Sequence, residues 1–288
     1  MICGFLMAGG SFIYASCILQ SRIPPNDDRA DFVQRFSGST LMISGGGKLP
    51  MEIRERFIDL AGGCDSPIIV IPSYLADQAQ IDSILQSWRD VGATHVQVLQ
   101  AISREDADQK SFASALDEAR GVWLGGGQQN HFARLYAETE VEMRLKHVLE
   151  RGGVVGGSSA GAAVMTNVMI EQGVETAEVG TGLDLLPNAV IDQHFFHRNR
   201  LNRLAGVLDQ HPELMGFGID EGTALVVQLQ RGRLGVLGDS YVFARVKNES
   251  AKQPRFAILK RGDQIDIAGL KNGAMIGSPQ MLDEMLME

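Results

Sequence analysis

The sequence predicts an α/β fold in which a mostly parallel sheet carries helices on both faces. From residue 39 onward, short apolar runs alternate with segments of helical periodicity, the pattern of a three-layer parallel sheet. Three of the apolar runs end in clusters of glycine, as sharp strand-to-helix turns require. After about residue 215, strands follow one another directly, so we expect a strand-rich C-terminal part that completes or caps the same sheet.

The expected elements follow in a regular order. The predicted strands span residues 41–44, 67–72, 95–99, 121–124, 154–155, 189–191, 215–219, 223–230, 233–237, 241–246 and 255–260. The predicted helices begin after Pro50, carry the spaced apolar residues between 81 and 88, and cover 106–119, 130–137 and 141–151. A further basic helix is expected shortly after His194.

Residues 1–38 are expected to lie outside this single domain of residues 39–288. Residues 1–19 are apolar or small but contain no Lys or Arg, and residues 20–38 have the composition of a linker. The segment from Tyr14 to Cys17 faintly resembles a bacterial lipoprotein cleavage box. The pattern leaves open whether these residues are a signal or lipoprotein segment, and it favours neither an exported or envelope-tethered location nor a cytoplasmic one.

Composition and cysteine spacing argue against some classes of function. The 288 residues carry a net charge of −9, which argues weakly against nucleic-acid binding because phosphate contacts need clustered Lys and Arg. Three cysteines imply no disulfide framework, and none has zinc-ligand spacing. We therefore expect no metal and no nucleic-acid partner.

Two of the glycine turns leave alternatives open. The segment 45–47 could begin a dinucleotide site, but it lacks the G-x-G-x-x-G spacing, so a tight strand-to-helix turn is favoured. The segment 125–127, followed by Gln128, could be only a turn. It could also supply backbone N–H groups and an amide side chain beside an active site, because sites in such folds lie at the carboxyl ends of strands.

The third turn places Ser159 inside G-x-S-x-G, between an apolar strand and a helix of small residues. A nucleophilic serine must project from a sharp turn, and flanking glycines remove the clashes of Cβ atoms. The N–H of Ala160 would then lie at a helix N-terminus, where a developing oxyanion is stabilised. A phosphate-binding or packing turn remains an alternative, because this short motif also occurs by chance.

A nucleophilic serine needs a base and an acid, and the sequence offers His194 and Glu221 at two predicted strand ends. Three arginines follow the histidine within nine residues, and arginine binds carboxylates through two parallel hydrogen bonds. A structural histidine and a solvated basic helix face are the alternatives.

Three segments together resemble the cyanophycinases of peptidase family S51, which also contains the aspartyl dipeptidases. They are GGSSAGAAVM (156–165), DQHFFHRNRLNRL (192–204) and GIDEGTALVV (218–227). WLGGGQQ (123–129) is similar to a further turn of the family, and the likeness covers most of the chain. The resemblance implies a class I glutamine amidotransferase-like domain with a nucleophile elbow, a homodimer, and no cofactor.

The resemblance also implies residue roles. Ser159 matches the family nucleophile, His194 its general base and Glu221 the acid that orients the base. The oxyanion donors are expected at Ala160 and at Gly127, with Gly126 as the other possibility. The substrate-binding positions that match are Gln128, Asp192, Gln193, Arg198, Arg200 and Arg203. The implied activity is that of a serine-type exopeptidase that cuts cyanophycin, an arginine-bearing poly-aspartate, into β-Asp-Arg dipeptides.

Departures from the family pattern keep other functions open. Gly127 stands where the family has an acidic residue, Ser158 where it usually has Thr, and the stretch from Ser159 to His194 is shorter than expected. A first alternative is an S51-type peptidase of short aspartyl or isoaspartyl peptides. A second is an α/β-hydrolase esterase, which would use His211 with Asp184 or Asp192. A third is an inactive exported binding protein on the same fold.

Overall fold

The structure, a computed structural model, describes residues 29–246 and 255–272. The predicted apolar segment of residues 1–19 and residues 20–28 of the predicted linker lie outside the described residues. The rest of the expected linker differs from the prediction, because helix α1 (Arg29–Phe36) buries Phe32 and Phe36 against the domain. These two phenylalanines are four residues apart and therefore lie on one face of the helix.

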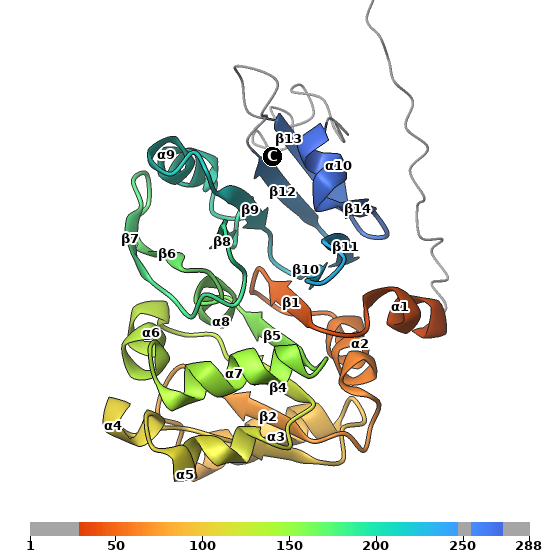
Figure 1. The fold of residues 1–288 in the computed structure, drawn as a ribbon, viewed down its shortest axis with the longest axis vertical. Helices are drawn as coiled ribbons and strands as arrows, with labels where there is room; N and C mark the ends of the chain where they lie inside the picture. The colour runs from red at the N-terminus through yellow and green to blue at the C-terminus, as the bar shows by residue number, and fades with distance from the viewer. Residues whose placement is uncertain (1–28, 247–254, 273–288) are drawn as a thin grey trace, which may run out of the picture.

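The central sheet has eight strands in the order β14-β11-β10-β1-β5-β4-β2-β3. Five of them run parallel and occupy one side of the sheet: β1 (Thr40–Ser44), β5 (Val154–Ser158), β4 (Gly121–Leu124), β2 (Ile68–Ile71) and β3 (Val96–Val98). The antiparallel strands β10 (Thr223–Gln228), β11 (Arg233–Gly238) and β14 (Gln264–Asp266) extend it. The predicted α/β fold is confirmed (Figure 1).

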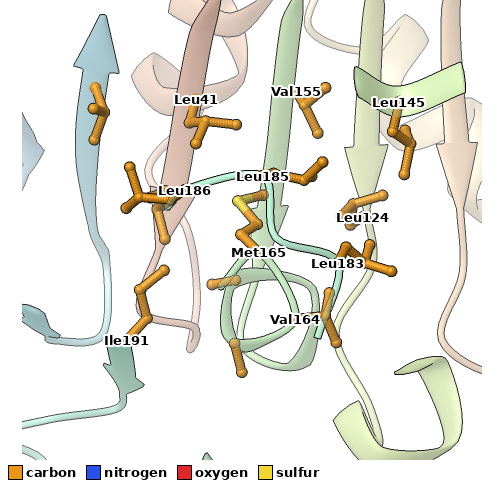
Figure 2. Packing of buried hydrophobic residues seen from close by; sticks show 14 of the residues in the cluster. Leu41, Leu124, Leu145, Val155, Val164, Met165, Leu183, Leu185, Leu186 and Ile191 are labelled. Carbon is orange, nitrogen blue, oxygen red and sulfur yellow. The ribbon is translucent and has the colours of Figure 1, made fainter. Parts of the chain in front are cut away.

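Each face of this sheet has its own hydrophobic cluster. Along β1, Leu41 and Ile43 join one cluster and Met42 joins the other, because successive strand side chains point to opposite faces. Helices α6 (Gln129–Tyr136) and α7 (Glu140–Glu150) cover the first face, and α2 (Met51–Ala61) and α3 (Gln78–Arg89) cover the second. Figure 2 shows part of the first cluster, where Leu145 of α7 lies near the strand residue Leu124.

The expected strand-rich C-terminal part is present, and its strands are divided between the central sheet, which some of them complete, and a second sheet. A second sheet has the order β13-β12-β9-β8, built from β8 (Ala189–Gln193), β9 (Met215–Ile219), β12 (Tyr241–Val246) and β13 (Arg255–Lys260). Periodicity shows that a segment is a strand, but it cannot show which strand it pairs with. Because β8 and β9 run parallel, both end toward the same edge of this sheet.

Other elements differ from or add to the expectation. The helix predicted over 106–119 is split into α4 (Arg104–Ala107), α5 (Lys110–Ala113) and the 3-10 turn η1 (Ser114–Leu116). Asp108 stands at the break, where its carboxylate accepts a hydrogen bond from the backbone of Glu140 at 3.1 Å. The hairpin of β6 (Val168–Gln172) and β7 (Glu178–Thr181) and the helix α10 (Ile267–Asn272) were not predicted. The two helices nearest the predicted site are α8 (Ala160–Ala163) and α9 (Leu201–Gln210).

Among the described residues, none of the helices combines the length and the apolar character that crossing a bilayer requires.

Candidate active site

Ser159 occupies a sharp turn between β5 and α8. Its backbone angles are φ 54° and ψ −111°, a region that non-glycine residues rarely adopt and that marks a functional turn. The turn is anchored by the Ser159 N–H, which donates to the carbonyl of Ser44 at 3.0 Å. A Cβ on Gly157 would lie 2.5 Å from the carbonyl of Gly161, and a Cβ on Gly161 would lie 2.1 Å from that of Leu124. The small residues therefore allow the close packing that fixes the elbow.

His194 and Glu221 complete a hydrogen-bonded chain with this serine. The Ser159 Oγ lies 2.8 Å from Nε2 of His194, and Nδ1 of His194 lies 2.5 Å from Oε1 of Glu221. His194 follows β8 directly and Glu221 follows β9, so the parallel pairing of these strands brings the two residues together. The arrangement has the geometry of a nucleophile, a base and an orienting acid in the order serine, histidine, acid.

The glycine turn at 45–47 belongs to this site. A Cβ on Gly46 would lie 2.4 Å from Cε1 of His194, and a Cβ on Gly47 would lie 2.5 Å from Oε2 of Glu221. The carbonyl of Gly45 accepts the His194 N–H at 2.8 Å. The spacing of the glycines favoured a plain turn here. The role of the turn could not be read from that spacing, because its contacts join segments about 150 and 175 residues apart in the chain.

The turn after β4 lies on the other side of Ser159. A Cβ on Gly126 would lie 3.5 Å from Cβ of Ser159, whereas Gly127, at φ +145°, adjoins Ser73. The N–H of Ala160 is at the first position of α8. This loop and this helix start therefore both lie next to Ser159. The expected amide residue, Gln128, is exposed at the start of α6.

The predicted substrate-binding arginines differ in their surroundings. Arg203 is only 3% exposed, and its guanidinium bonds both carboxylate oxygens of the fully buried Asp192. Arg200 is half-buried and donates to the backbone carbonyl of Gln193 at 2.5 Å. Arg198 is exposed. Arg198 is therefore the most exposed of the three arginines, whereas the guanidinium of Arg203 is bound by groups of the protein itself.

Burial and neighbouring charges shift the ionisation of this cluster. Burial lowers the pKa of His194, as do Arg198 and Arg200, while the hydrogen bond that its Nδ1–H donates to Glu221 opposes that shift. Burial also lowers the pKa of Arg200 to about 10. Burial raises the pKa of Asp192, against the opposing effect of its hydrogen bonds with Arg203. A neutral His194 is the form that can accept a proton from Ser159.

A second histidine lies next to the acid. Nε2 of His197 is 3.9 Å from Oε1 of Glu221, and its backbone N–H donates to Oδ1 of Asp220 at 2.9 Å. By contrast, His211, the base of the esterase alternative, ends helix α9 beside Glu213. Within the described ranges, no group of three or more His, Cys, Asp or Glu side chains is arranged to hold a metal ion.

The chain is similar to known proteins in sequence and in fold. The model of peptidase family S51 matches residues 40–235. A cyanophycinase from Synechococcus elongatus is 33% identical over 248 residues, covering 81% of this chain and 75% of its own. A cyanophycinase from Trichormus variabilis is 36% identical over 201 residues, covering 66% and 67%. In fold, the crystal structure of a peptidase from an acI-B1 Actinobacterium is similar, with a TM-score of 0.63 at 23% identity, over 81% of this chain and 98% of that one.

Proposed function

Because the chain belongs to peptidase family S51, it is a peptidase, and we propose that it is a serine-type exopeptidase that hydrolyses cyanophycin to β-Asp-Arg dipeptides. The observation that carries the proposal is the hydrogen-bonded chain of Ser159, His194 and Glu221 at the carboxyl edge of the two sheets. The cyanophycinases to which the chain is similar support the substrate.

The proposed reaction begins with attack of the Ser159 Oγ on the scissile carbonyl carbon. His194 Nε2 takes the hydroxyl proton, and Glu221 stabilises the imidazolium that forms. The N–H of Ala160 and an N–H of the 126–127 segment hold the tetrahedral oxyanion. His194 then protonates the leaving amine, and a water molecule, activated by the same histidine, hydrolyses the acyl-enzyme.

Charged side chains around the serine suit a substrate with many carboxylates. Arg198 is exposed four residues after the base, where its guanidinium could bind a substrate carboxylate bidentately. Behind this arginine, the loop that carries His194 and Arg198 would be held by hydrogen bonds of Arg200 to Gln193 and Asp192, which would not contact the substrate.

Incubation of the purified protein with cyanophycin tests the proposal. We expect release of β-Asp-Arg, detected by chromatography and mass spectrometry, and no release by the Ser159→Ala variant. Release of larger internal fragments instead would contradict the exopeptidase assignment. Cleavage of isoaspartyl dipeptides with the polymer left intact would contradict the polymer substrate.

Hydrolysis of short acidic peptides is the second candidate. The observation that favours it is the burial of Arg203, which leaves fewer exposed cations than the sequence alone indicated. A non-catalytic binding role is the third, and labelling of Ser159 by a fluorophosphonate probe would exclude it.

A further inference from the structure

Two apolar side chains are exposed on the loop between β2 and α3. Tyr74 is 44% exposed and Leu75 is 59% exposed, although their neighbours Ser73 and Ala76 are 1% and 5% exposed. Single exposed apolar residues are common on protein surfaces. Here two adjacent ones lie at the carboxyl edge of a parallel sheet, which is the edge that carries Ser159.

The loop is held at both ends. At the start, the Ser73 Oγ donates to the carbonyl of Gly126 at 2.5 Å. At the end, the side chain of Gln100 accepts from the Ala76 N–H at 2.9 Å and donates to its carbonyl at 3.0 Å. Asp77 then caps α3. Because hydrogen bonds fix the residues on either side of Tyr74 and Leu75, the loop exposes these two side chains at a defined position.

That place adjoins the nucleophile. Gly126 lies against Ser159, and a Cβ on the next residue, Gly127, would lie 3.7 Å from Cδ1 of Tyr74. In the sheet, β5, which Ser159 follows directly, lies between β1 and β4. The turn after β1 contacts His194, and the turn after β4 contacts Tyr74. Tyr74 therefore stands on the side of the serine opposite the base and Arg198.

The chemistry of the loop suits a cation. An aromatic ring attracts a guanidinium placed over its face, and an exposed leucine can pack against the methylenes of an arginine side chain. Asp77 adds an exposed carboxylate three residues from Tyr74.

We propose that Tyr74 and Leu75 form a substrate subsite that binds the guanidinium-bearing side chain of an arginine, on the side of Ser159 away from Arg198. The inference deepens the proposed function and rests on it. Arg198 would take a carboxylate and Tyr74 a guanidinium, so the two sides of the nucleophile recognise opposite charges.

The test compares Tyr74→Leu and Tyr74→Phe on two substrates. One is a short oligomer of β-Asp-Arg units, and the other is the same oligomer with citrulline, which is neutral, in place of arginine. We expect Tyr74→Leu to raise KM for the arginine oligomer about two- to thirtyfold, with kcat little changed, and to leave KM for the citrulline oligomer unaltered. Tyr74→Phe, which keeps the ring, should restore most of the affinity. Met143→Ala, an exposed apolar change on α7, is the control.

Equal effects of Tyr74→Leu on both oligomers, or none on either, would overturn the subsite. A binding measurement in the Ser159→Ala background distinguishes failure of the proposed function from failure of the subsite. If the wild-type protein cuts neither oligomer, the proposed activity fails. In that case the affinity for the arginine oligomer is measured by calorimetry in Ser159→Ala and in Ser159→Ala/Tyr74→Leu. A lower affinity of the double variant would still support the subsite, and an equal affinity would overturn it.

Discussion

At the scale of single residues, Ser159 and His194 both take positive φ angles, 54° and 52°. Each such angle costs about 1–3 kcal/mol in a non-glycine residue, so the surrounding contacts must hold it in place. The contacts that do so come from the carbonyls of Ser44 and Gly45, at the end of β1. One strand end therefore positions the two side chains that exchange the proton in the proposed reaction.

The first prediction concerns the base. His194→Ala should lower kcat by about a thousandfold or more, because the Ser159 hydroxyl loses its proton acceptor. His211→Ala, at the end of α9, should leave turnover within about twofold of wild type, in line with a surface change. Steady-state kinetics on the cleaved substrate measures both. Activity that survived the first change and disappeared with the second would instead support the esterase arrangement.

The second prediction concerns Gly46. In Gly46→Ala the new Cβ would overlap the His194 ring, and the residue would also keep a φ of +105°. A displacement of the ring by about 1 Å is expected to lower kcat roughly a hundredfold. The matched control is Gly206→Ala on α9, where a Cβ meets nothing within 4 Å. That variant should have a free energy of unfolding about 0.5–1 kcal/mol higher, seen as a slightly higher urea midpoint, and unchanged kinetics. Equal activity of the two variants would show that the turn does not position the base.

The third prediction concerns pH. The proposed mechanism needs neutral His194, and burial lowers its pKa, so kcat/KM should fall only below the ordinary imidazole value of about 6.5. The hydrogen bond that Glu221 accepts from His194 raises that pKa, so Glu221→Gln should move the acid limb to still lower pH while lowering kcat. A pH–rate profile of both proteins measures the shift. An acid limb that moved upward in the variant would contradict this assignment.

At the scale of elements, the Asp192–Arg203 pair connects three segments of the chain by hydrogen bonds. Asp192 lies on β8, Arg203 on α9, and the Arg203 guanidinium also donates to the carbonyl of Gly173 beside the β6–β7 hairpin at 2.5 Å. Asp192 is two residues before His194. Asp192 and Arg203 matched substrate-binding positions in the sequence. In the structure their ion pair fixes the end of β8, from which His194 follows.

The fourth prediction follows from that burial. Asp192→Ala leaves the Arg203 charge buried without its carboxylate and should lower the free energy of unfolding by about 3–5 kcal/mol. Arg198→Ala, an exposed change, should alter it by less than about 0.5 kcal/mol but should raise KM. Urea unfolding with parallel kinetics separates the two. A stable Asp192→Ala protein with raised KM would return Asp192 to the role of a substrate ligand.

At the scale of the whole molecule, two sheets and the loops at their ends make one site. Ser159 comes from the central sheet, while His194 and Glu221 follow strands of the second sheet. Glu221 occupies the turn from β9 of the second sheet to β10 of the central one, so a single turn joins the sheets and carries the acid. The site depends on the packing of the two sheets and not on any one element.

The fifth prediction concerns assembly. The resemblance to family S51 implies a homodimer, so light scattering should give a mass about twice the 31.2 kDa of the chain. The measurement is made over a range of protein concentrations, because association responds to concentration by mass action. A single-chain mass throughout that range would contradict the dimer.

The sequence by itself determined the alternation of strands and helices, the elbow around Ser159 and the residue types of the site. The alternation and the elbow follow from local spacing, since side-chain periodicity and glycine turns act over a few residues, whereas the site residues were indicated by the resemblance of their motifs to family S51. Only the tertiary structure decided that C-terminal strands divide between two sheets, that Gly46 and Gly47 adjoin His194 and Glu221, and that Arg203 is buried. Those facts depend on which strands pair and on what packs over their ends, and contacts between residues far apart in the chain leave no local pattern to detect.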